Sequence, residues 1–342
     1  MGRLEGDRLK KIIDDFATKN VIVLGDPMLD HYVYTEARKL SREAPVIVSD
    51  YVSEEFNPGG AANLAAILKR LGAGVSLIGV IGKDNEGKTL LNELDAEGVD
   101  TSSIIDVEGR PTCVKTRIYV GRRQYLRIDR EDRKSVDLSV TSKLINNLKT
   151  KIDQHDIVIL SDHDKGTLTT MLISEVVKLS RSLNKRIVGR PKVDHLLDFA
   201  YVNSLLSTVR EASEAIGTSV LNDTSIRNIG FNILTRLEPS SFYLWDRNTS
   251  FLFEPGYVSY FPASNGYTNH ERIGLRDVIT AAYALAVACS APALDAALIA
   301  RAAEGVGNSS INNKEEMSRE RLKVIIDRLE KQGYSYTSVG VK

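Results

Sequence analysis

Apolar segments with the length of β-strands alternate with segments of helical periodicity along most of this chain of 342 residues. The alternation is regular from residue 139 onward. The predicted elements are strands over 21–26 and 75–82, helices over 57–72 and 84–98, a helix to 153, a strand over 157–162, a helix over 167–183, strands over 186–190 and 202–207, a helix over 223–238, strands over 241–245 and 250–254, and helices over 276–290, 293–306 and 317–333. This alternation predicts an α/β fold whose mostly parallel sheet has helices on both faces.

Two segments depart from this alternation and predict a small β lid. Residues 32–53, around Pro45, alternate apolar and polar residues in two short runs. Residues 112–131 do the same on either side of a Gly-Arg-Arg turn, which is typical of a hairpin. We expect both segments to cover one edge of the sheet, within a single domain that spans residues 1–342.

The charge of the chain is balanced, since Lys plus Arg and Asp plus Glu each number 45. Nucleic acids and anionic membranes bind basic faces, so this balance argues against both as partners. No apolar run is long enough to span a membrane, and the charged residues 1–20 do not resemble a secretion signal. Cys113 and Cys289 lie far apart in apolar surroundings, which predicts thiols in a reducing compartment. We therefore expect a cytoplasmic protein, and the five histidines show no spacing typical of a structural zinc site.

One segment satisfies the P-loop pattern of nucleotide-binding proteins. Residues 82–89 follow a buried strand and open a helix, as that pattern requires. However, Asp84 and Glu86 would stand where backbone N–H groups must surround a phosphate, and their charge would repel it. We therefore favour a turn in which Asp84 caps the helix, Gly87 permits close packing and Lys88 is solvated. A P-loop NTPase is the less favoured alternative.

A second segment, residues 269–290, places a glycine and an acid before an apolar helix. Gly274 precedes Asp277 by three residues, and Arg276 lies between them. An acid in the first turn of such a helix is either a cap or a general base beside an anion site. The pattern of residues alone leaves both interpretations open.

Several stretches of the N-terminal third closely resemble the PfkB, or ribokinase-like, carbohydrate kinases. They are VIVLGDPMLDHYVY from residue 21, SREAPVIV from residue 41, NPGGAANLAAILKRLGAGVSLIGVIGKDNEGKTLLNELDAEGV from residue 57 and RPTCVKTRIYVGRRQYLRIDRE from residue 110. The resemblance is dense over about 20–131, weaker over 158–168, and thin afterwards. Within the family the chain is most similar to the D-glycero-β-D-manno-heptose-7-phosphate kinases of lipopolysaccharide core synthesis. The resemblance implies a ribokinase-like three-layer sandwich with a small β lid.

The resemblance also implies roles for individual residues. The family's Gly-Gly turn is present as Gly59-Gly60, and its Gly-Ala-Gly-Asp loop falls on residues 274–277, so Asp277 is the expected base, with Gly274 and Arg276 beside it. The residues expected to bind the sugar and its phosphate are Asp26, Asp30, Gly59, Gly60, Asn63, Lys115, Arg117, Arg122, Arg127 and Lys165. The residues expected near the nucleotide and Mg²⁺ are Lys192, Thr208 and Glu211. Each residue alone also has an ordinary structural explanation, but their common spacing favours a sugar site.

The C-terminal half departs from the family pattern. Arg276 replaces the second glycine of the Gly-Ala-Gly-Asp loop, where a side chain would be strained if the backbone had a positive φ. Arg190 replaces the acid of an Asp-Pro-Lys motif, and Thr208 replaces the amide of an Asn-x-x-Glu motif that keeps Glu211. Further departures are Trp245 and Ser250 in a Thr-x-x-x-x-Gly turn, and Arg301 in place of an asparagine near the purine.

Two interpretations fit these departures. In the first, the chain is an ATP-dependent kinase of a sugar phosphate such as heptose 7-phosphate, and the Arg276 guanidinium replaces backbone amides at the transferring phosphoryl group. In the second, the chain is an inactive homologue that keeps the sugar pocket and acts as a sugar-phosphate sensor or partner subunit. We rank the kinase first and expect Mg²⁺ to arrive with the nucleotide. We also expect a homodimer through the lid, because an exposed β lid needs cover.

Overall fold

A central sheet of eleven strands forms the middle layer of the protein. The computed structural model describes residues 2–246, 249–262, 274–306 and 317–340. The strand order is β1-β15-β14-β13-β12-β11-β10-β9-β2-β5-β6. The strands are β1 (Gly2–Arg3), β2 (Asn20–Gly25), β5 (Gly74–Gly82), β6 (Asp100–Val107), β9 (Ile157–Ser161), β10 (Arg186–Arg190), β11 (Ser204–Thr208), β12 (Ser241–Trp245), β13 (Ser250–Glu254), β14 (Tyr257–Phe261) and β15 (Ser335–Gly340). The strands from β12 to β6 pair in parallel, which confirms the predicted α/β class.

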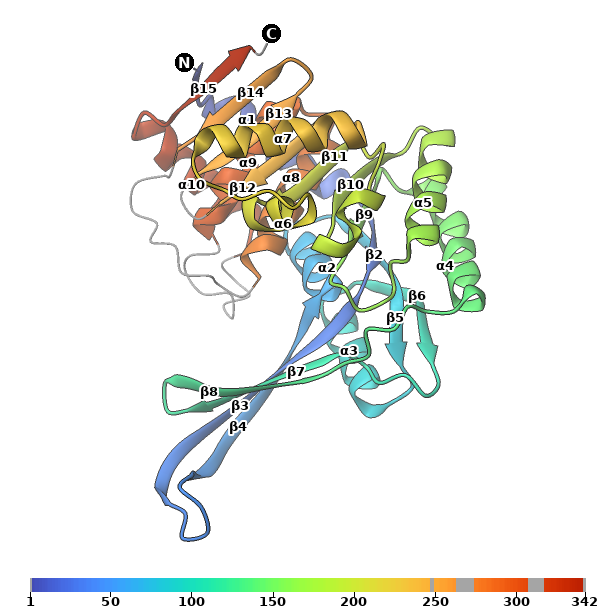
Figure 1. Cartoon of the computed structure of the whole chain (residues 1–342), viewed down its shortest axis with the longest axis vertical. Helices are drawn as coiled ribbons and strands as arrows, with labels where there is room; N and C mark the ends of the chain where they lie inside the picture. The colour runs from blue at the N-terminus through green and yellow to red at the C-terminus, as the bar shows by residue number, and fades with distance from the viewer. Residues whose placement is uncertain (1, 247–248, 263–273, 307–316, 341–342) are drawn as a thin grey trace.

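Side chains that alternate along the strands build an apolar core on each face of the sheet. In β2, Val21 and Val23 belong to one core and Ile22 and Leu24 to the other, because successive side chains point to opposite faces. All four side chains are fully buried. Helices cover both faces, so the molecule has the three layers that the sequence predicted (Figure 1).

The helices divide between the two cores. One core includes side chains from α1 (Gly6–Asp14), α2 (Ala61–Arg70), α3 (Asn85–Ala96), α8 (Leu275–Ala288), α9 (Ala293–Val306) and α10 (Arg319–Lys331). The other core includes side chains from α4 (Leu138–Lys151), α5 (Thr170–Ser182), α6 (Val209–Ala215) and α7 (Asp223–Leu237). Short 3₁₀ segments are η1 (Asp15–Thr18), η2 (Ile152–Gln154) and η3 (Val193–Asp198). Within the described ranges, no helix combines the length and apolar character needed to cross a membrane.

A second sheet forms the lid and projects from the body as a long arm (Figure 1). Its strand order is β4-β3-β7-β8. The strands are β3 (Pro27–Leu40), β4 (Ile47–Gly60), β7 (Val114–Val120) and β8 (Arg123–Arg130). The predicted segments 32–53 and 112–131 fall within this sheet, but β3 begins earlier and β4 ends later than expected. The ends of β3 and β4 nearest the body are buried, as Met28 and Leu29 of β3 show. Their sequence therefore resembles a core segment and lacks the alternation of a lid strand.

The sequence pattern missed β1, β6, β14, β15 and α6. β1 and β6 are the edge strands of the main sheet, where one neighbour is enough and the apolar pattern is weak. β14 and β15 pair antiparallel with each other although they lie far apart in the sequence. Helix α6 has seven residues, which is too short for a helical period to stand out.

Candidate functional site

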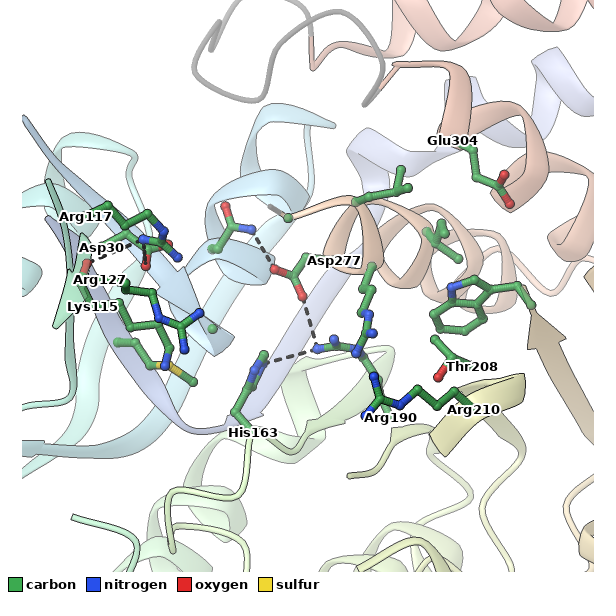
Figure 2. Close-up of a pocket in the computed structure, with 18 of the residues that line it drawn as sticks. Asp30, Lys115, Arg117, Arg127, His163, Arg190, Thr208, Arg210, Asp277 and Glu304 are labelled. Atoms are coloured by element: carbon green, nitrogen blue, oxygen red, sulfur yellow. Dashed lines mark hydrogen bonds and ion pairs between the residues drawn. The ribbon is translucent and has the colours of Figure 1, made fainter. Parts of the chain in front are cut away.

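A cavity of about 520 Å³ opens between the base of the lid and the carboxyl ends of the parallel strands (Figure 2). The order of the strands reverses here. From β2 the chain adds β5 and β6 on one side, and from β9 it adds β10 and β11 on the other side. Such switch points are common ligand sites in α/β proteins. The predicted residues that line the cavity are Asp30, Gly60, Asn63, Lys115, Arg117, Arg127, Thr208, Gly274, Arg276 and Asp277. The predicted residues outside its lining are Asp26, Gly59, Arg122, Lys165, Lys192 and Glu211.

Asp277 lies in the first turn of α8, near the middle of the cavity (Figure 2). The helix begins after Gly274, whose φ of 82° is in the left-handed region that favours glycine. Asn63 Nδ2 donates a hydrogen bond to Asp277 Oδ2 at 2.6 Å, and Arg190 Nη1 donates to Oδ1 at 3.1 Å. Burial raises the pKa of the Asp277 carboxyl, against the opposing charge of Arg190. The Asp277 carboxylate therefore lines the cavity and does not cap α8, which begins without a side-chain cap.

Cations from the lid line the other end of the cavity (Figure 2). Arg117 Nη1 on β7 donates to Asp30 Oδ1 on β3 at 2.6 Å, and both side chains are buried. Burial raises the pKa of Asp30, while Arg117 opposes that rise. Lys115 and Arg127 both pair with Asp129 of β8, at 3.4 Å and 2.8 Å. This end of the cavity, which we call the lid end, is suited to a ligand that carries both hydroxyl groups and a phosphate.

The Gly59-Gly60 turn lets the start of α2 approach the first lid strand closely. Gly60 has a φ of +55°, and a Cβ atom there would lie 2.7 Å from the Asp26 carbonyl oxygen. A Cβ atom at Gly59 would lie 3.0 Å from Asp30 Oδ2. The two glycines thus bring Asn63, in the first turn of α2, beside the acids of the cavity.

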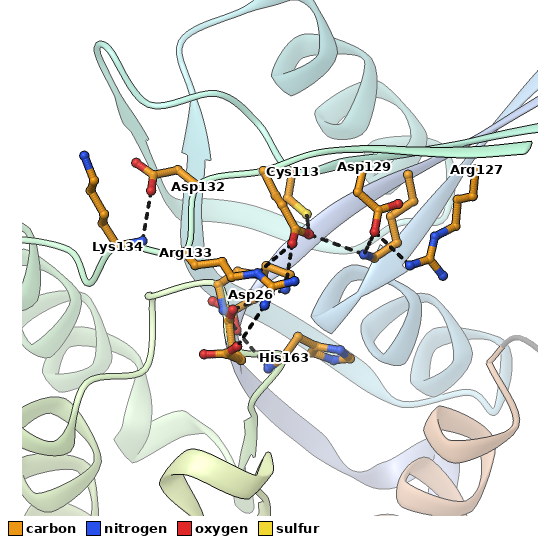
Figure 3. A network of polar contacts seen from close by, with 12 residues as sticks. Asp26, Cys113, Arg127, Asp129, Asp132, Arg133, Lys134 and His163 are labelled. Atoms are coloured by element: carbon orange, nitrogen blue, oxygen red, sulfur yellow. Dashed lines mark hydrogen bonds and ion pairs between the residues drawn. The ribbon is translucent and has the colours of Figure 1, made fainter.

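Asp26 follows β2 but its carboxylate holds a loop of the body (Figure 3). Three backbone N–H groups in the loop 163–167 donate to it, at distances between 2.9 and 3.3 Å. Lys165 of that loop pairs with Glu131 at 3.3 Å, and Lys115 pairs with the same carboxylate at 3.4 Å. Asp26 and Lys165 therefore tie the loop after β9 to the lid, one layer behind the cavity wall.

Glu131 is the centre of this second layer, since it pairs with Lys115, Arg133 and Lys165. Although burial opposes it, the neighbouring cations, among them Arg133 at 2.8 Å, lower the pKa of Glu131 to about 2. The Cys113 thiol lies 3.7 Å from the same carboxylate, and burial raises its pKa to about 12. Cys113 is therefore a protonated thiol at neutral pH, and Cys289 is also a free cysteine.

A cluster around Glu211 lies beside the opposite end of the cavity, which we call the phosphoryl end. Lys192 Nζ and Arg276 Nη1 both donate to Glu211 Oε1, at 2.8 Å and 2.7 Å. Thr208 Oγ1 donates to Oε2 at 2.8 Å. The same two residues form the capping box that begins α6, in which Glu211 N donates to Thr208 Oγ1 and Thr208 N donates to Glu211 Oε2. Although burial opposes it, the charges of Lys192 and Arg276 lower the pKa of Glu211 to about 2. Arg276 and Thr208 are the members of this cluster that line the cavity.

The conditional expectation of backbone strain at Arg276 is not met. Arg276 is the second residue of α8, and it is absent from the described non-glycine residues with positive φ. The left-handed conformation falls on Gly274 instead, because that residue begins the helix. An arginine is therefore accommodated here without backbone cost, and 39% of its side chain is exposed.

Residues 82–89 do not form an anion-binding loop. Asp84 Oδ1 accepts hydrogen bonds from Gly87 N at 2.8 Å and from Thr112 Oγ1 at 2.6 Å. Its Oδ2 accepts a bond from Thr112 N at 2.9 Å. The Asp84 carboxylate thus accepts the hydrogen bond from Gly87 N that a bound phosphate would need. This confirms that Asp84 caps α3.

Some of the residues that line the cavity were given no role from the sequence. They are Met28, His163, Arg190, Arg210, Trp245, Asp246, Leu275, Ile279 and Glu304. Arg190 and Trp245 carried a signal, since both stand at departures from the family motifs. His163 carried none, because its position depends on the loop after β9, where it lies 3.2 Å from Arg190 Nη1. Burial and nearby cations hold the pKa of His163 well below its ordinary value, so it is neutral.

The residues at the phosphoryl end do not fit Mg²⁺. This ion takes oxygen ligands in near-octahedral geometry, commonly one or two carboxylates together with substrate phosphates. Both oxygens of Glu211 and both oxygens of Asp277 already accept hydrogen bonds from side chains of the protein. Across the described part of the chain, no group of three His, Cys, Asp or Glu side chains could hold a metal ion.

The three-layer α/β sandwich with its separate β lid is a ribokinase-like fold. Residues 18–180 match the model of the pfkB family of carbohydrate kinases. Residues 18–180 therefore carry a PfkB carbohydrate kinase match, in agreement with the resemblance of the N-terminal third.

Curated relatives extend the similarity beyond the matched segment. The bifunctional protein HldE of Geobacter metallireducens is 31% identical over 303 residues, which cover 86% of this chain and 62% of that protein. HldE of Campylobacter fetus is 34% identical over 209 residues, which cover 61% of this chain and 45% of that protein. The chain thus spans about three fifths or less of the length of these relatives.

Solved structures show the same fold at low sequence identity. Phosphofructokinase-2 from Escherichia coli, in complex with substrates and products, superposes with a TM-score of 0.73 at 15% identity, over 91% of this chain and 99% of that chain. Arabidopsis thaliana ribokinase, complexed with ribose and ATP, superposes with a TM-score of 0.67 at 18% identity, over 90% of this chain and 98% of that chain.

Proposed function

We propose that the chain transfers a phosphoryl group from ATP to a hydroxyl of a sugar phosphate of the heptose 7-phosphate type, with Asp277 as general base. The observation that supports this most directly is the placement of Asp277. Asp277 is 6% exposed, lies at the start of α8, and stands between the lid cations and Thr208 in the cavity (Figure 2). A base in this position can face an acceptor hydroxyl on one side and a phosphoryl donor on the other.

The proposed reaction is a direct displacement. The acceptor hydroxyl gives its proton to Asp277 while its oxygen forms a bond to the γ-phosphorus. The bond between that phosphorus and the bridging oxygen breaks, and ADP leaves with the electron pair. The backbone N–H groups at the start of α8 and the Arg276 guanidinium lie where negative charge would gather.

At the lid end, the sugar phosphate would be bound by groups of two kinds. Asp30 and Asn63 offer hydrogen bonds to hydroxyl groups. Lys115 and Arg127 offer charge to the phosphate, and both are held in place by Asp129. The spacing between these groups and Asp277 would select which hydroxyl reaches the base.

One observation favours a second candidate function, a sugar-phosphate binder without turnover. Arg190 Nη1 is paired with Asp277 Oδ1, and an arginine beside a carboxylate makes it a weaker base. Glu211 is also engaged, by Lys192 and Arg276. In this case the cavity would bind the same sugar phosphate, and the chain would act as a sensor or partner subunit.

A turnover assay with ATP and heptose 7-phosphate separates the two candidates. For the kinase, Asp277→Asn should lower turnover by about 10²–10⁴-fold, because proton transfer by a positioned base contributes that much. Equilibrium dialysis should show that the variant still binds the sugar phosphate. Lys88→Ala tests the P-loop segment, and Asp223→Asn removes an exposed acid from the first turn of α7; both should keep full turnover. A wild-type chain that binds the sugar phosphate and never turns over would establish the binder instead.

We also propose that a second copy of the chain covers the lid. Large apolar side chains are exposed on it, namely Leu40, Val46, Ile47, Tyr51, Val52, Tyr125, Leu126 and Ile128. A sheet with such a surface needs a partner to avoid uncontrolled association. Sedimentation of the full chain at micromolar concentration should show a dimer, and Tyr51→Lys with Leu126→Lys should convert it to a monomer. A wild-type chain that sediments as a monomer would refute this assembly.

A further inference from the structure

The phosphoryl end of the cavity already contains the positive charge that a phosphate chain requires. Arg190, Lys192 and Arg276 lie there against two carboxylates, those of Asp277 and Glu211. Three cations against two anions leave one net positive charge in this cluster. A bound phosphate chain would therefore meet cations that the protein has fixed in advance.

Each carboxylate oxygen in the cluster accepts at least one hydrogen bond from a side chain of the protein. Glu211 Oε1 accepts from an ammonium and a guanidinium, and its Oε2 accepts from the Thr208 hydroxyl. Asp277 accepts from the amide of Asn63 and from Arg190. A divalent cation would have to displace these donors and then lie beside the cations that it displaced.

A guanidinium that pairs with a carboxylate can also bind a phosphate. It carries five N–H donors in a fixed plane, and the hydrogen bonds from Arg276 to Glu211 and from Arg190 to Asp277 are each donated by Nη1. Both arginines line the cavity. Their charge would take the place that a metal ion occupies when it neutralises the phosphates of a nucleotide.

We propose that the phosphoryl end binds the phosphate chain of a nucleoside diphosphate or triphosphate without a divalent metal ion, through Arg190, Arg276 and Lys192. This inference rests on the proposed function, because it assumes that the cavity takes phosphorylated ligands. It adds a property of the site, namely that its affinity for a phosphate chain does not depend on Mg²⁺. An inorganic oligophosphate shares the same chemistry and would compete for the site.

The test measures binding to the full chain with and without metal. Radiolabelled ADP is dialysed against the protein in excess EDTA and again in excess Mg²⁺, with tripolyphosphate as the competitor. Trp245, the sole tryptophan of the chain, lines the cavity, so its emission reports whether the ligand lies there. We expect the dissociation constant in EDTA to be within about threefold of that in Mg²⁺, or lower. Binding of ADP that appears only with Mg²⁺ would overturn the proposal. Competition by tripolyphosphate assigns recognition to the phosphates, and its failure would overturn the proposal.

Variants identify the groups responsible. Arg276→Gln should weaken metal-free ADP binding at least tenfold, whereas Arg227→Gln, which changes an exposed arginine on α7, should not. Arg276→Gln combined with Lys192→Met frees Glu211 Oε1 and should make the remaining binding dependent on Mg²⁺. Metal-free binding that Arg276→Gln leaves unchanged would place the ligand elsewhere and overturn the proposal.

Binding of the sugar phosphate, measured on the same samples, separates this inference from the proposed function. If the sugar phosphate binds and ADP requires Mg²⁺, the inference fails and the proposed function stands. If neither ligand binds under any condition, the proposed function fails, and the inference fails with it. Sugar-phosphate binding by the Arg276→Gln variant also shows that this variant is folded.

Discussion

The lid end and the phosphoryl end of the cavity are each built around a buried Asp–Arg pair, yet they have different relations to the family. At the lid end, Asp30 and Arg117 are both residues that the resemblance assigns to the sugar site. At the phosphoryl end, the resemblance assigns the base to Asp277, but Arg190, which pairs with it, stands where the resemblance predicts an acid. The lid end therefore contains the residues that the resemblance predicts, whereas the phosphoryl end has arginines at two positions where the resemblance predicts an acid and a glycine.

The difference shows that the fold and the charge of the site are set by separate groups of residues. The apolar cores hold the strand ends and the start of α8 in place whatever polar residues line the cavity. Arg276 fits into α8 without strain, and Arg190 and Arg276 both find carboxylate partners. The polar residues at the phosphoryl end are therefore separate from the residues that hold the fold, and the proposed activity would depend on their charge.

Breaking the two pairs is the strongest way to test this comparison. Arg117→Met should lower the free energy of unfolding by about 3 kcal/mol, because it leaves the buried Asp30 carboxylate unpaired. Arg190→Met should cost less, about 1–2 kcal/mol, because Asp277 keeps its 2.6 Å hydrogen bond from Asn63. Urea unfolding of both variants, followed by far-UV circular dichroism, measures the two losses.

The double variant Asp30→Asn with Arg117→Met is the control for this experiment. It removes the stranded charge and should recover part of the stability that Arg117→Met loses. A loss in Arg190→Met that exceeds the loss in Arg117→Met would contradict the comparison, since it would make the phosphoryl end the more structural of the two.

The sequence predicted the fold class and much of the lid end, and it predicted less of the phosphoryl end. Strand and helix periods, together with the Gly-Gly turn, depend on local residues that can be read directly. Arg190 and His163 come together because β9 and β10 are neighbours in the sheet. The sequence alone does not show which strands are neighbours, so it could not place these two residues in the cavity. The expectation of strain at Arg276 failed for a related reason, because the start of α8 falls at Gly274 and only the backbone shows it.

The smallest expected effect is a difference in how the stability of the two ends depends on pH. His195, in the η3 turn after Lys192, lies 3.0 Å from Asp162 Oδ2, and this contact raises the pKa of His195 to about 8 from an ordinary value of 6.5. The same Asp162 oxygen accepts a hydrogen bond from Lys192 N at 2.9 Å, so the pair braces the turn that positions Lys192. In the layer behind the lid end, the pKa of Glu131 is about 2, so this carboxyl group does not titrate near neutral pH.

The stabilisation from His195 should be complete below about pH 6.5 and should be lost as the pH rises through about 8, because the folded state holds the proton more tightly than the unfolded state. A difference of 1.5 pH units between these values corresponds to at most about 2 kcal/mol, and partial exposure reduces it. Unfolding free energies of the wild type and of His195→Gln, measured at about pH 6 and about pH 9, should converge at the higher pH. If the wild type and His195→Gln differ in unfolding free energy by the same amount at both pH values, the contact between His195 and Asp162 is not an ion pair. The stability of the phosphoryl end would then not depend on this histidine near neutral pH.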